Sequence, residues 1–341
     1  MPMAKTNSER NPKLGTGRRI PAVRPAVGRE TLVEKLGPLS ELAGTWQGTG
    51  FNLIARPDFE GKGALFLELN QTIEVLKFEP IGSPIPNRGS AQQDIELFGL
   101  TYLQTVIDSV TGGALHIEPG VWITQPRTTA PPETPPAGSS IVARLATVPH
   151  GSAVLAEGLA SSMVITGGTF RIPPVNTAPF PAGTAMPPGG TQGAFPPYDL
   201  EDTSPAAVNF RTPFGNTPAI PLPATIDSIG MQDVINDPTR LLQQAIRGHF
   251  IEKVIRLQIA TTPELVPYSG GGIENIPFLA ANADAALMFA TFWIERIRHP
   301  ARPIMQLQYV QTVILNFPIL DTTKNFGWPH VSVATLQKTF G

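Results

Sequence analysis

The sequence predicts a mainly β protein, an up-and-down antiparallel barrel of about ten strands with a proline-rich insertion and one or two short helices. Its 341 residues include 37 prolines and 32 glycines beside 41% hydrophobic residues. That composition suits many strands joined by turns better than a helical bundle. About ten segments also have β-type patterns, and this number of strands closes into a barrel that can hold a small ligand. A two-sheet sandwich fits the alternation almost as well.

Ten β-rich segments are expected to form the wall. In chain order they are residues 45–54, 65–75, 97–107, 114–124, 141–148, 153–160, 250–260, 285–297, 305–317 and 330–338. The second is the clearest, because its leucines, Ile73 and Val75 alternate with Asn70, Thr72 and Glu74. One face of that strand therefore packs in a core, and the other faces solvent or a polar lumen.

Helical patterns are few. Residues 31–43 predict one or two short turns, broken at Gly37-Pro38. Residues 237–248 predict one helix of about three turns. Asp237 can cap it, Pro238 can take its first position and Gly248 can end it.

The chain divides into a flexible N-terminal tail, residues 1–30, and a single barrel domain, residues 31–341. Within the domain, residues 166–280 are expected to form an inserted cover of loops, a helix and strand. Residues 173–223 contain 13 prolines, which lack the amide donor that a central ladder needs. The aromatic residues of this stretch indicate that it packs on protein. A lid and an arm in a homodimer are the two uses that fit.

Composition excludes several classes of function. The chain has no cysteine, which excludes disulfides, thiolate metal sites and Cys-ligated haem. A net charge of −2, with 15% charged residues, gives no field for nucleic acid. No run of about 18 apolar residues predicts a membrane span, and no signal peptide is evident. We expect a soluble cytoplasmic protein with a small-molecule ligand.

Common catalytic motifs are absent from the sequence. The five histidines include no pair with the i, i+4 spacing of a helical zinc site. The glycine run 269–272 lacks the Lys-Ser/Thr of a phosphate loop, and Gly48 and Gly50 lack the third glycine of a dinucleotide fingerprint. Hydrolytic zinc and nucleotide chemistry are therefore not expected.

His330 is the most informative residue. It begins the last predicted strand and shares a face with Ser332, Ala334 and Leu336. A flat group can lie over the two small side chains while a neutral imidazole binds a metal. An ordinary closing strand with one hydrogen-bonded histidine fits the same pattern.

Two further β motifs carry unusual residues. In the segment 44–51, GTWQGTGF, Trp46 shares a face with Gly48 and Gly50 and is expected to fold over its own strand as a barrel plug. In the segment 115–122, LHIEPGVW, His116 and Glu118 point the same way. His116 is then either a structural residue paired with Glu118 or a distal catalytic group.

These motifs, the segment 145–158 and the Pro-His before the last strand together resemble the nitrobindin family of haem-binding barrels, which are related to lipocalins and fatty-acid-binding proteins. The resemblance covers about residues 36–165 and 285–340. It implies a haem b at one mouth of the barrel and iron held by His330. By the same resemblance the cofactor would contact Thr45, Trp46, His116, Ser332 and Ala334, and His116 is the candidate catalytic residue.

The family's activity gives the expected function, which is to bind or transform nitrogen oxides or peroxides. It implies an isomerase that converts peroxynitrite to nitrate, or a peroxidase-like enzyme. The chain departs from the family in its double length and in Pro119. Met288 and Met305 either line the cavity or fill the core, and Arg56, Arg144 and Arg296 either pair with haem propionates or form surface ion pairs.

Two alternatives remain open at this point. One is a barrel that carries an apolar small molecule, such as a fatty acid, without haem. The other is a structural or interaction protein that works through its proline-rich insertion.

Overall fold

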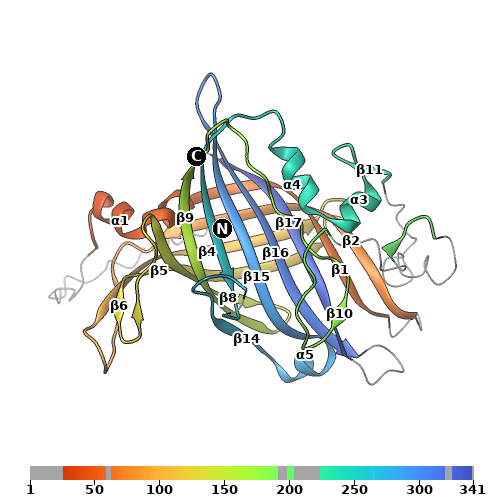
Figure 1. The fold of residues 1–341 in the computed structure, drawn as a ribbon, viewed down its shortest axis with the longest axis horizontal. Coiled ribbons are helices and arrows are strands. Elements are labelled where there is room, and N and C mark those ends of the chain that lie inside the picture. Colours follow the sequence, from red (N-terminus) through yellow and green to blue (C-terminus); the bar gives the residue numbers. More distant parts are fainter. Residues whose placement is uncertain are drawn as a thin grey trace, which may run out of the picture.

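Ten antiparallel strands close into a barrel in the computed structural model, which describes residues 26–58, 63–190, 198–202, 223–263, 265–318 and 325–339 (Figure 1). The wall consists of β1 (Gly44–Asp58), β2 (Gly63–Pro80), β4 (Ile95–Asp108), β5 (Ala114–Gln125), β8 (Ser139–Val148), β9 (Ser152–Val164), β13 (Ile251–Ala260), β15 (Asp284–Ile297), β16 (Ile304–Pro318) and β17 (Asn325–Thr339). Each pairs with the next, and β17 returns to β1 from Thr339↔Thr45 to Val331↔Leu53. The ten predicted strands and their closure are confirmed, and the sandwich is excluded.

Short strands and helices accompany the ten strands of the wall. They are the strands β3 (Ile85–Asn87), β6 (Thr128–Thr129), β7 (Pro132–Glu133), β10 (Phe180–Pro181), β11 (Thr225–Ile226), β12 (Ile229–Gly230) and β14 (Gly271–Asn275), and the helices α1 (Arg29–Leu36), η1 (Gly37–Glu41), α3 (Met231–Asn236), α4 (Thr239–Ala245) and α5 (Pro277–Asn282). The break between α1 and the 3₁₀ helix η1 falls at Gly37, as predicted, where φ is +53°. Among the described residues, none of the helices is long and apolar enough to span a bilayer.

The N-terminal helices close one end of the barrel. Leu36, Leu39 and Leu42 pack with Trp46 in the hydrophobic cluster inside the barrel, which we call the inner cluster. The indole Nε1 of Trp46 donates to the carbonyl of Leu42 at 2.7 Å. Trp46 is therefore part of a plug, as the sequence predicts. The predicted tail differs in extent, because α1 already begins at Arg29. Residues 1–25 lie outside the described part.

The two faces of strand β2 show which side of the wall points into the lumen. Thr72 and Glu74 are buried in the lumen, where both make hydrogen bonds. On the other face, Leu67 joins an outer hydrophobic cluster, whereas Ile73 is exposed. The polar face is therefore the inner one, and much of the apolar face meets the insertion.

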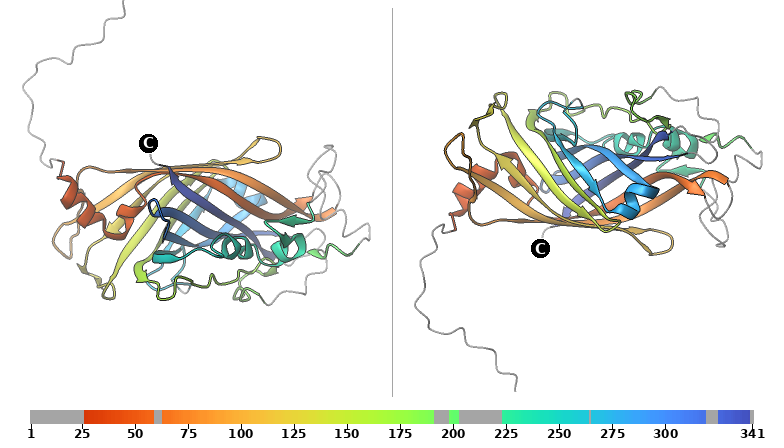
Figure 2. Two further views of the ribbon diagram at one scale, coloured as in Figure 1. Left: turned by 90° about the horizontal axis from the view of Figure 1, so that it is seen from above. Right: turned by 90° about the horizontal axis from the view of Figure 1, so that it is seen from below.

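The insertion covers one flank of the barrel. In Figure 2, α3 and α4 lie along the outer wall, and α4 contacts β16 and β17. Val234 and Leu242 of these helices pack with Trp293 and Val333 of the wall. Within the predicted insertion 166–280, β13 belongs to the barrel itself and β14 pairs with β9.

The predicted helix at 237–248 is shorter than three turns. Its helical part is α4, and the Asp237 carboxylate accepts hydrogen bonds from the amide and hydroxyl of Thr239 at 3.2 and 2.7 Å. Gly248 has a φ of +81°, as expected of a terminating glycine. A separate helix, α3, precedes the cap, and the sequence reasoning missed it.

A carboxyl group is buried on this covered flank. Glu295 on β15 is fully buried and shares a face of the strand with Trp293 and Ile297, which belong to the outer cluster. One of its oxygens accepts from Gln306 Nε2 at 2.7 Å, and the other has no partner among the described residues. Burial raises the pKa of Glu295 to about 8, and the hydrogen bond from Gln306 offsets only part of this effect.

Replacing Glu295 by glutamine is expected to stabilise the protein increasingly as the pH rises. The unfolded carboxyl ionises near its ordinary pKa of 4.5, whereas the folded one keeps its proton to about pH 8. Wild-type stability therefore falls across this window, in full by on the order of 4–5 kcal/mol. Glu295→Gln removes that fall. Urea unfolding at about pH 4 and about pH 8.5 measures it.

The control is Glu79→Gln, which changes an exposed carboxyl. Its effect on the free energy of unfolding should be small at both pH values. If Glu295→Gln and the wild type lose the same stability between the two pH values, Glu295 does not hold its proton in the folded state.

Candidate functional site

Three histidines from separate elements occupy one region of the barrel. His330 lies on β17, His116 near the start of β5 and His150 in the turn between β8 and β9. The rings of His116 and His150 have centroids 5.9 Å apart. Burial is the main cause that lowers the pKa of His330 to about 3, and the charges of His116 and His150 lower it further. The three imidazoles are therefore near neighbours.

The imidazole of His330 is neutral and has no hydrogen bond with any described residue. It shares the inner face of β17 with Ser332, Ala334 and Leu336, of which the last two belong to the inner cluster. The side chain is partly exposed. A ring nitrogen with a free lone pair therefore faces the lumen.

Apolar residues flank His330 across the wall. In the strand register it stands opposite Val313 of β16, which stands opposite Met288 of β15. Met288 is buried in the inner cluster, and Met305 packs against that cluster from its edge. Of the two predicted uses of these methionines, core filling is the one the packing supports directly.

A buried ion pair lies next to His116 inside the barrel. Glu118 and Arg144 form a salt bridge with only 2% and 3% of their side chains exposed. Burial alone would raise the pKa of Glu118, but the Arg144 guanidinium, with His116 and the Tyr102 hydroxyl, outweighs burial and brings the pKa to about 2. Burial alone would lower the pKa of Arg144, but Glu118 and Tyr102 together hold it above its ordinary value. Both groups are therefore ionised inside the barrel.

Neighbouring polar groups complete this pair. The Tyr102 hydroxyl donates to Glu118 and accepts from Arg144 Nε at 2.9 Å. Arg144 Nη1 donates to the side-chain oxygen of Gln311 at 2.6 Å. His116 Nε2 lies 3.1 Å from the second oxygen of Glu118. The carboxylate thus links the buried arginine to His116 at the histidine cluster.

The glycine of the second motif, Gly120, leaves room for the ring of Tyr102. A Cβ atom at this position would lie 2.5 Å from the Tyr102 ring, which is closer than atoms can pack. Glycine therefore lets the phenol lie over β5 and reach Glu118. Pro119 does not interrupt the strand, because β5 runs through it and pairs it with Leu103 of β4.

A second carboxyl group, that of Glu74, is buried in the lumen. Glu74 accepts hydrogen bonds from Tyr309 at 2.6 Å, Thr72 at 2.8 Å and Gln104 at 3.2 Å. Burial raises its pKa, although these bonds act in the opposite direction. A Cβ at Gly50 would lie 2.6 Å from the carboxyl of Glu74. The space at Gly50 is thus filled by the carboxyl group of Glu74, whereas the sequence predicts that Trp46 fills it.

The predicted site residues do not all come together. His116, Ser332 and His330 lie on the inner wall, and Ala334 is buried beside them on the same face. Trp46 pairs with Lys338, eight positions along β17 from His330, which is roughly 26 Å of strand. Thr45 alternates with Trp46 and therefore points to the outer side of the wall.

The three arginines have different environments. Arg144 was expected to form either a propionate contact or a surface pair, and the surface pair is wrong because its partner Glu118 is buried. Arg296 is exposed and pairs with Glu252 at 3.3 Å. The side chain of Arg56 lies outside the described part. A lone arginine between Val142 and Ala146, all facing inward, was the available signal for a buried pair.

Among the described residues, no group of three or more histidine or carboxylate side chains is arranged to hold a metal ion. The histidine cluster therefore offers single ligands to a bound group and does not form a cage for a bare ion.

No protein family matches the chain, and no curated protein does. A solved structure with a similar chain course is the crystal structure of Rv2717c from M. tuberculosis. It has 12% sequence identity and a TM-score of 0.36, and the match covers 91% of this chain and 98% of that one. So remote a likeness bears on neither ligand nor activity.

Replacing Arg144 by methionine is expected to cost about 3–5 kcal/mol of stability, because it leaves the Glu118 charge buried and unpaired. The double variant Glu118→Gln/Arg144→Met should recover most of this loss. Wild-type stability from the pair is present above pH 4.5 and is lost as the pH falls toward 2. Urea unfolding at neutral and acidic pH measures both effects.

Lys77→Met is the matched control, since Lys77 pairs with Glu79 on the exposed surface. Its cost should stay within about 1 kcal/mol. A similar cost for Lys77→Met and Arg144→Met would show that the lumen pair is solvated and has no special role.

Proposed function

We propose that the barrel binds a haem b beside its histidine cluster, with His330 as the single protein ligand to the iron. The observation that carries this proposal is the His330 imidazole, which is neutral, faces the lumen and has no hydrogen-bond partner among the described residues. Only the neutral form of imidazole can donate a lone pair to a metal. The small side chain of Ser332 next to it on the same face favours a flat group.

The donor set favours haem over a bare metal ion. A porphyrin supplies four nitrogens of its own, so the protein needs to contribute only one. The described residues offer no three-ligand group, but they offer His330. When bound, the haem supplies an iron with a free coordination position for a nitrogen oxide or a peroxide, which fits an isomerase or peroxidase-like activity.

We assign to His116 the role of a catalytic residue beside the bound reactant. Its Nε2 lies 3.1 Å from the ionised Glu118, and a carboxylate can only accept. Nε2 therefore carries the proton, and Nδ1 is left as an acceptor when the ring is neutral. Glu118 thereby fixes the orientation of His116, and Arg144 keeps Glu118 ionised.

The lumen is less suited to an apolar carrier. A fatty acid needs a cation for its carboxylate, and the buried candidate, Arg144, is already neutralised by Glu118. Aromatic side chains of Trp122, Phe292 and Tyr309 pack against one another in the inner cluster. An apolar chain that extended along the lumen, beyond the histidine cluster, would have to displace them.

Haem binding is tested by absorption spectroscopy of the full chain reconstituted with haemin. The wild type is expected to give a Soret band of a histidine-ligated haem, and His330→Ala to abolish or strongly shift it. His299→Ala is the matched control, because His299 is exposed in the turn between β15 and β16, and it should leave the spectrum unchanged.

Far-UV circular dichroism of each variant checks that the barrel is folded. A wild type that takes up no haem contradicts the proposal, and so does a Soret band that survives His330→Ala unaltered. In the first case, a co-purified lipid found by native mass spectrometry would support the apolar carrier instead.

A further inference from the structure

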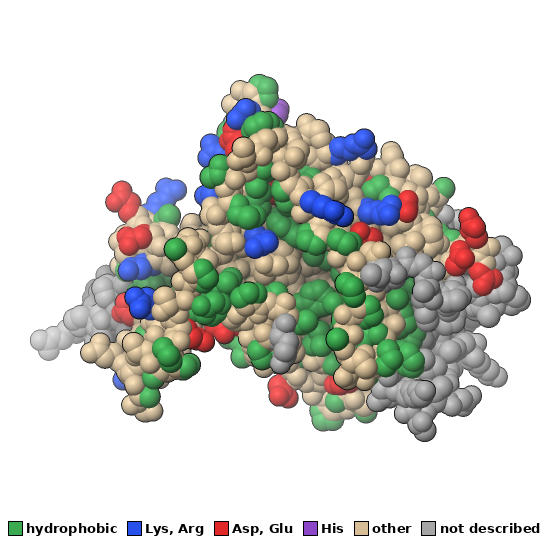
Figure 3. Space-filling view, in the orientation of Figure 1, with side chains coloured by type: hydrophobic (Ala, Val, Ile, Leu, Met, Phe, Trp, Pro, Cys, Tyr) green, Lys and Arg blue, Asp and Glu red, His purple; other side chains and the backbone are tan. Residues whose placement is uncertain are grey.

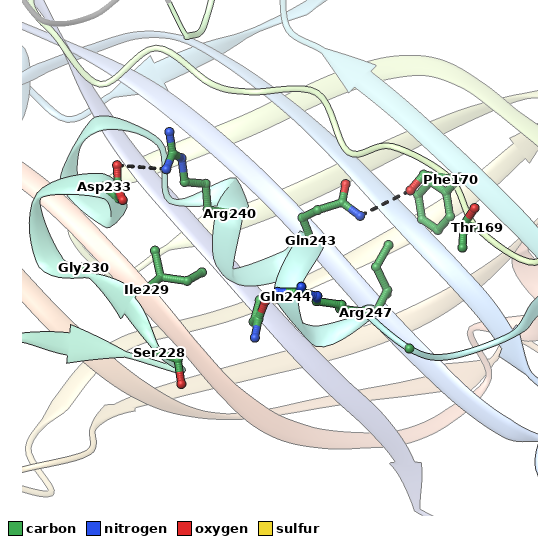
Figure 4. Close-up of a pocket in the computed structure, with 12 residues that line it drawn as sticks. Thr169, Phe170, Ser228, Ile229, Gly230, Asp233, Arg240, Gln243, Gln244 and Arg247 are labelled. Atoms are coloured by element: carbon green, nitrogen blue, oxygen red, sulfur yellow. Dashed lines mark hydrogen bonds and ion pairs between the residues drawn. The ribbon is translucent and has the colours of Figure 1, made fainter.

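A cavity of about 640 Å³ lies on the outer flank of the barrel, and His116, His150 and His330 are not among the residues that line it. Figure 4 shows its walls, which come from α3, α4, the β11–β12 hairpin and the segment that follows β9. Ligand pockets in proteins commonly measure about 300–1,000 Å³. This cavity is large enough for a small organic molecule, and its walls belong to the insertion.

One face of α4 and the turn after it supplies the charges. Arg240, Gln244 and Arg247 follow one another at spacings of four and three residues, which aligns them along one side. Arg240 donates to Asp233 at 2.8 Å, whereas Arg247 is exposed and has no partner among the described residues. The lining of the cavity therefore contains two cations, Arg240 and Arg247, and one anion, Asp233. Basic side chains are visible at the surface of this region in Figure 3.

The wall beside these charges is tied down. Gln243 donates through Nε2 to the carbonyl of Phe170 at 3.3 Å, and its oxygen accepts from the amide of Ile172 at 3.0 Å. Both ends of this side chain are thus used to hold α4 against the segment after β9. This wall of the cavity is therefore held in place by contacts within the protein.

The opposite wall holds two residues in an unusual backbone conformation. Asp227 and Ser228, the turn of the β11–β12 hairpin, have φ of +48° and +68°. Two-residue hairpin turns of this kind favour Asn-Gly, and other residues there cost free energy. The turn places Ser228 at the cavity, where its hydroxyl has no partner among the described residues.

We propose that this cavity binds a small organic anion that carries a carboxylate or phosphate group. Arg247, with the unused donors of Arg240, pairs with the charged group, because guanidinium donors fit both kinds of oxyanion. Ser228 and Gln244 add neutral hydrogen bonds, and the half-buried Phe170 and Ile229 contact the apolar body of the ligand. The site is separate from the barrel lumen and independent of haem.

The test is isothermal titration of the full chain with two probes, phenyl phosphate and benzoate, and with benzyl alcohol as the uncharged comparison. At least one anion is expected to bind saturably, while benzyl alcohol does not. Arg247→Gln should weaken that binding at least tenfold. Arg88→Gln should leave it unchanged, because Arg88 is an exposed arginine outside the cavity.

The outcomes separate cleanly. Saturable anion binding that Arg247→Gln weakens and Arg88→Gln does not weaken supports the proposal. No binding of either anion up to about 5 mM overturns it, and so does binding that Arg247→Gln leaves intact. His330→Ala should not change the titration, so the haem site and the anion site fail or hold separately.

Discussion

The pairing of the first wall strand with the last is the constraint on which the rest of the structure depends. Nine registered residue pairs between β1 and β17 turn an open sheet into a closed barrel, so that no long edge remains free. Closure also gives every inward side chain a shared interior. Polar residues that face this interior lose water and must find partners across the lumen. The contact of Arg144 with Gln311 and the contact of Glu74 with Tyr309 are both partnerships of this kind.

These buried contacts define the site more than they stabilise the barrel. A buried ion pair regains at best the cost of removing its charges from water, so Glu118 and Arg144 are weak evidence for stability. They do fix positions, because the pair has one geometry in which Tyr102, Gln311 and His116 are all satisfied. The glycines at 50 and 120 belong to the same arrangement, since a Cβ at either would collide with it.

The sequence predicted the wall well and the lumen poorly. Strand alternation is a local signal, and for that reason all ten strands lie where the pattern places them. Which face was inward could not be read locally, because Asn70, Thr72 and Glu74 are as polar as a solvent-facing row. Glu74 meets Tyr309 only through closure, across 235 residues of sequence. His330 was found because its small neighbours lie on its own strand, whereas Arg144 was misjudged because its partner lies on another.

The position of the insertion bears on how a ligand reaches His330. The described part of the insertion packs on the outer cluster along one flank, and its strand β10 continues the wall beside β17 where β1 has left it. It therefore extends and covers the wall. His150, by contrast, is exposed in the β8–β9 turn while its ring lies beside His116. The histidine cluster thus has a solvent-facing side, although β14 and Ile276 of the insertion contact the same turn at Ser152 and Gly151. The proposed small reactant would approach the lumen there without passing the helices α3 and α4.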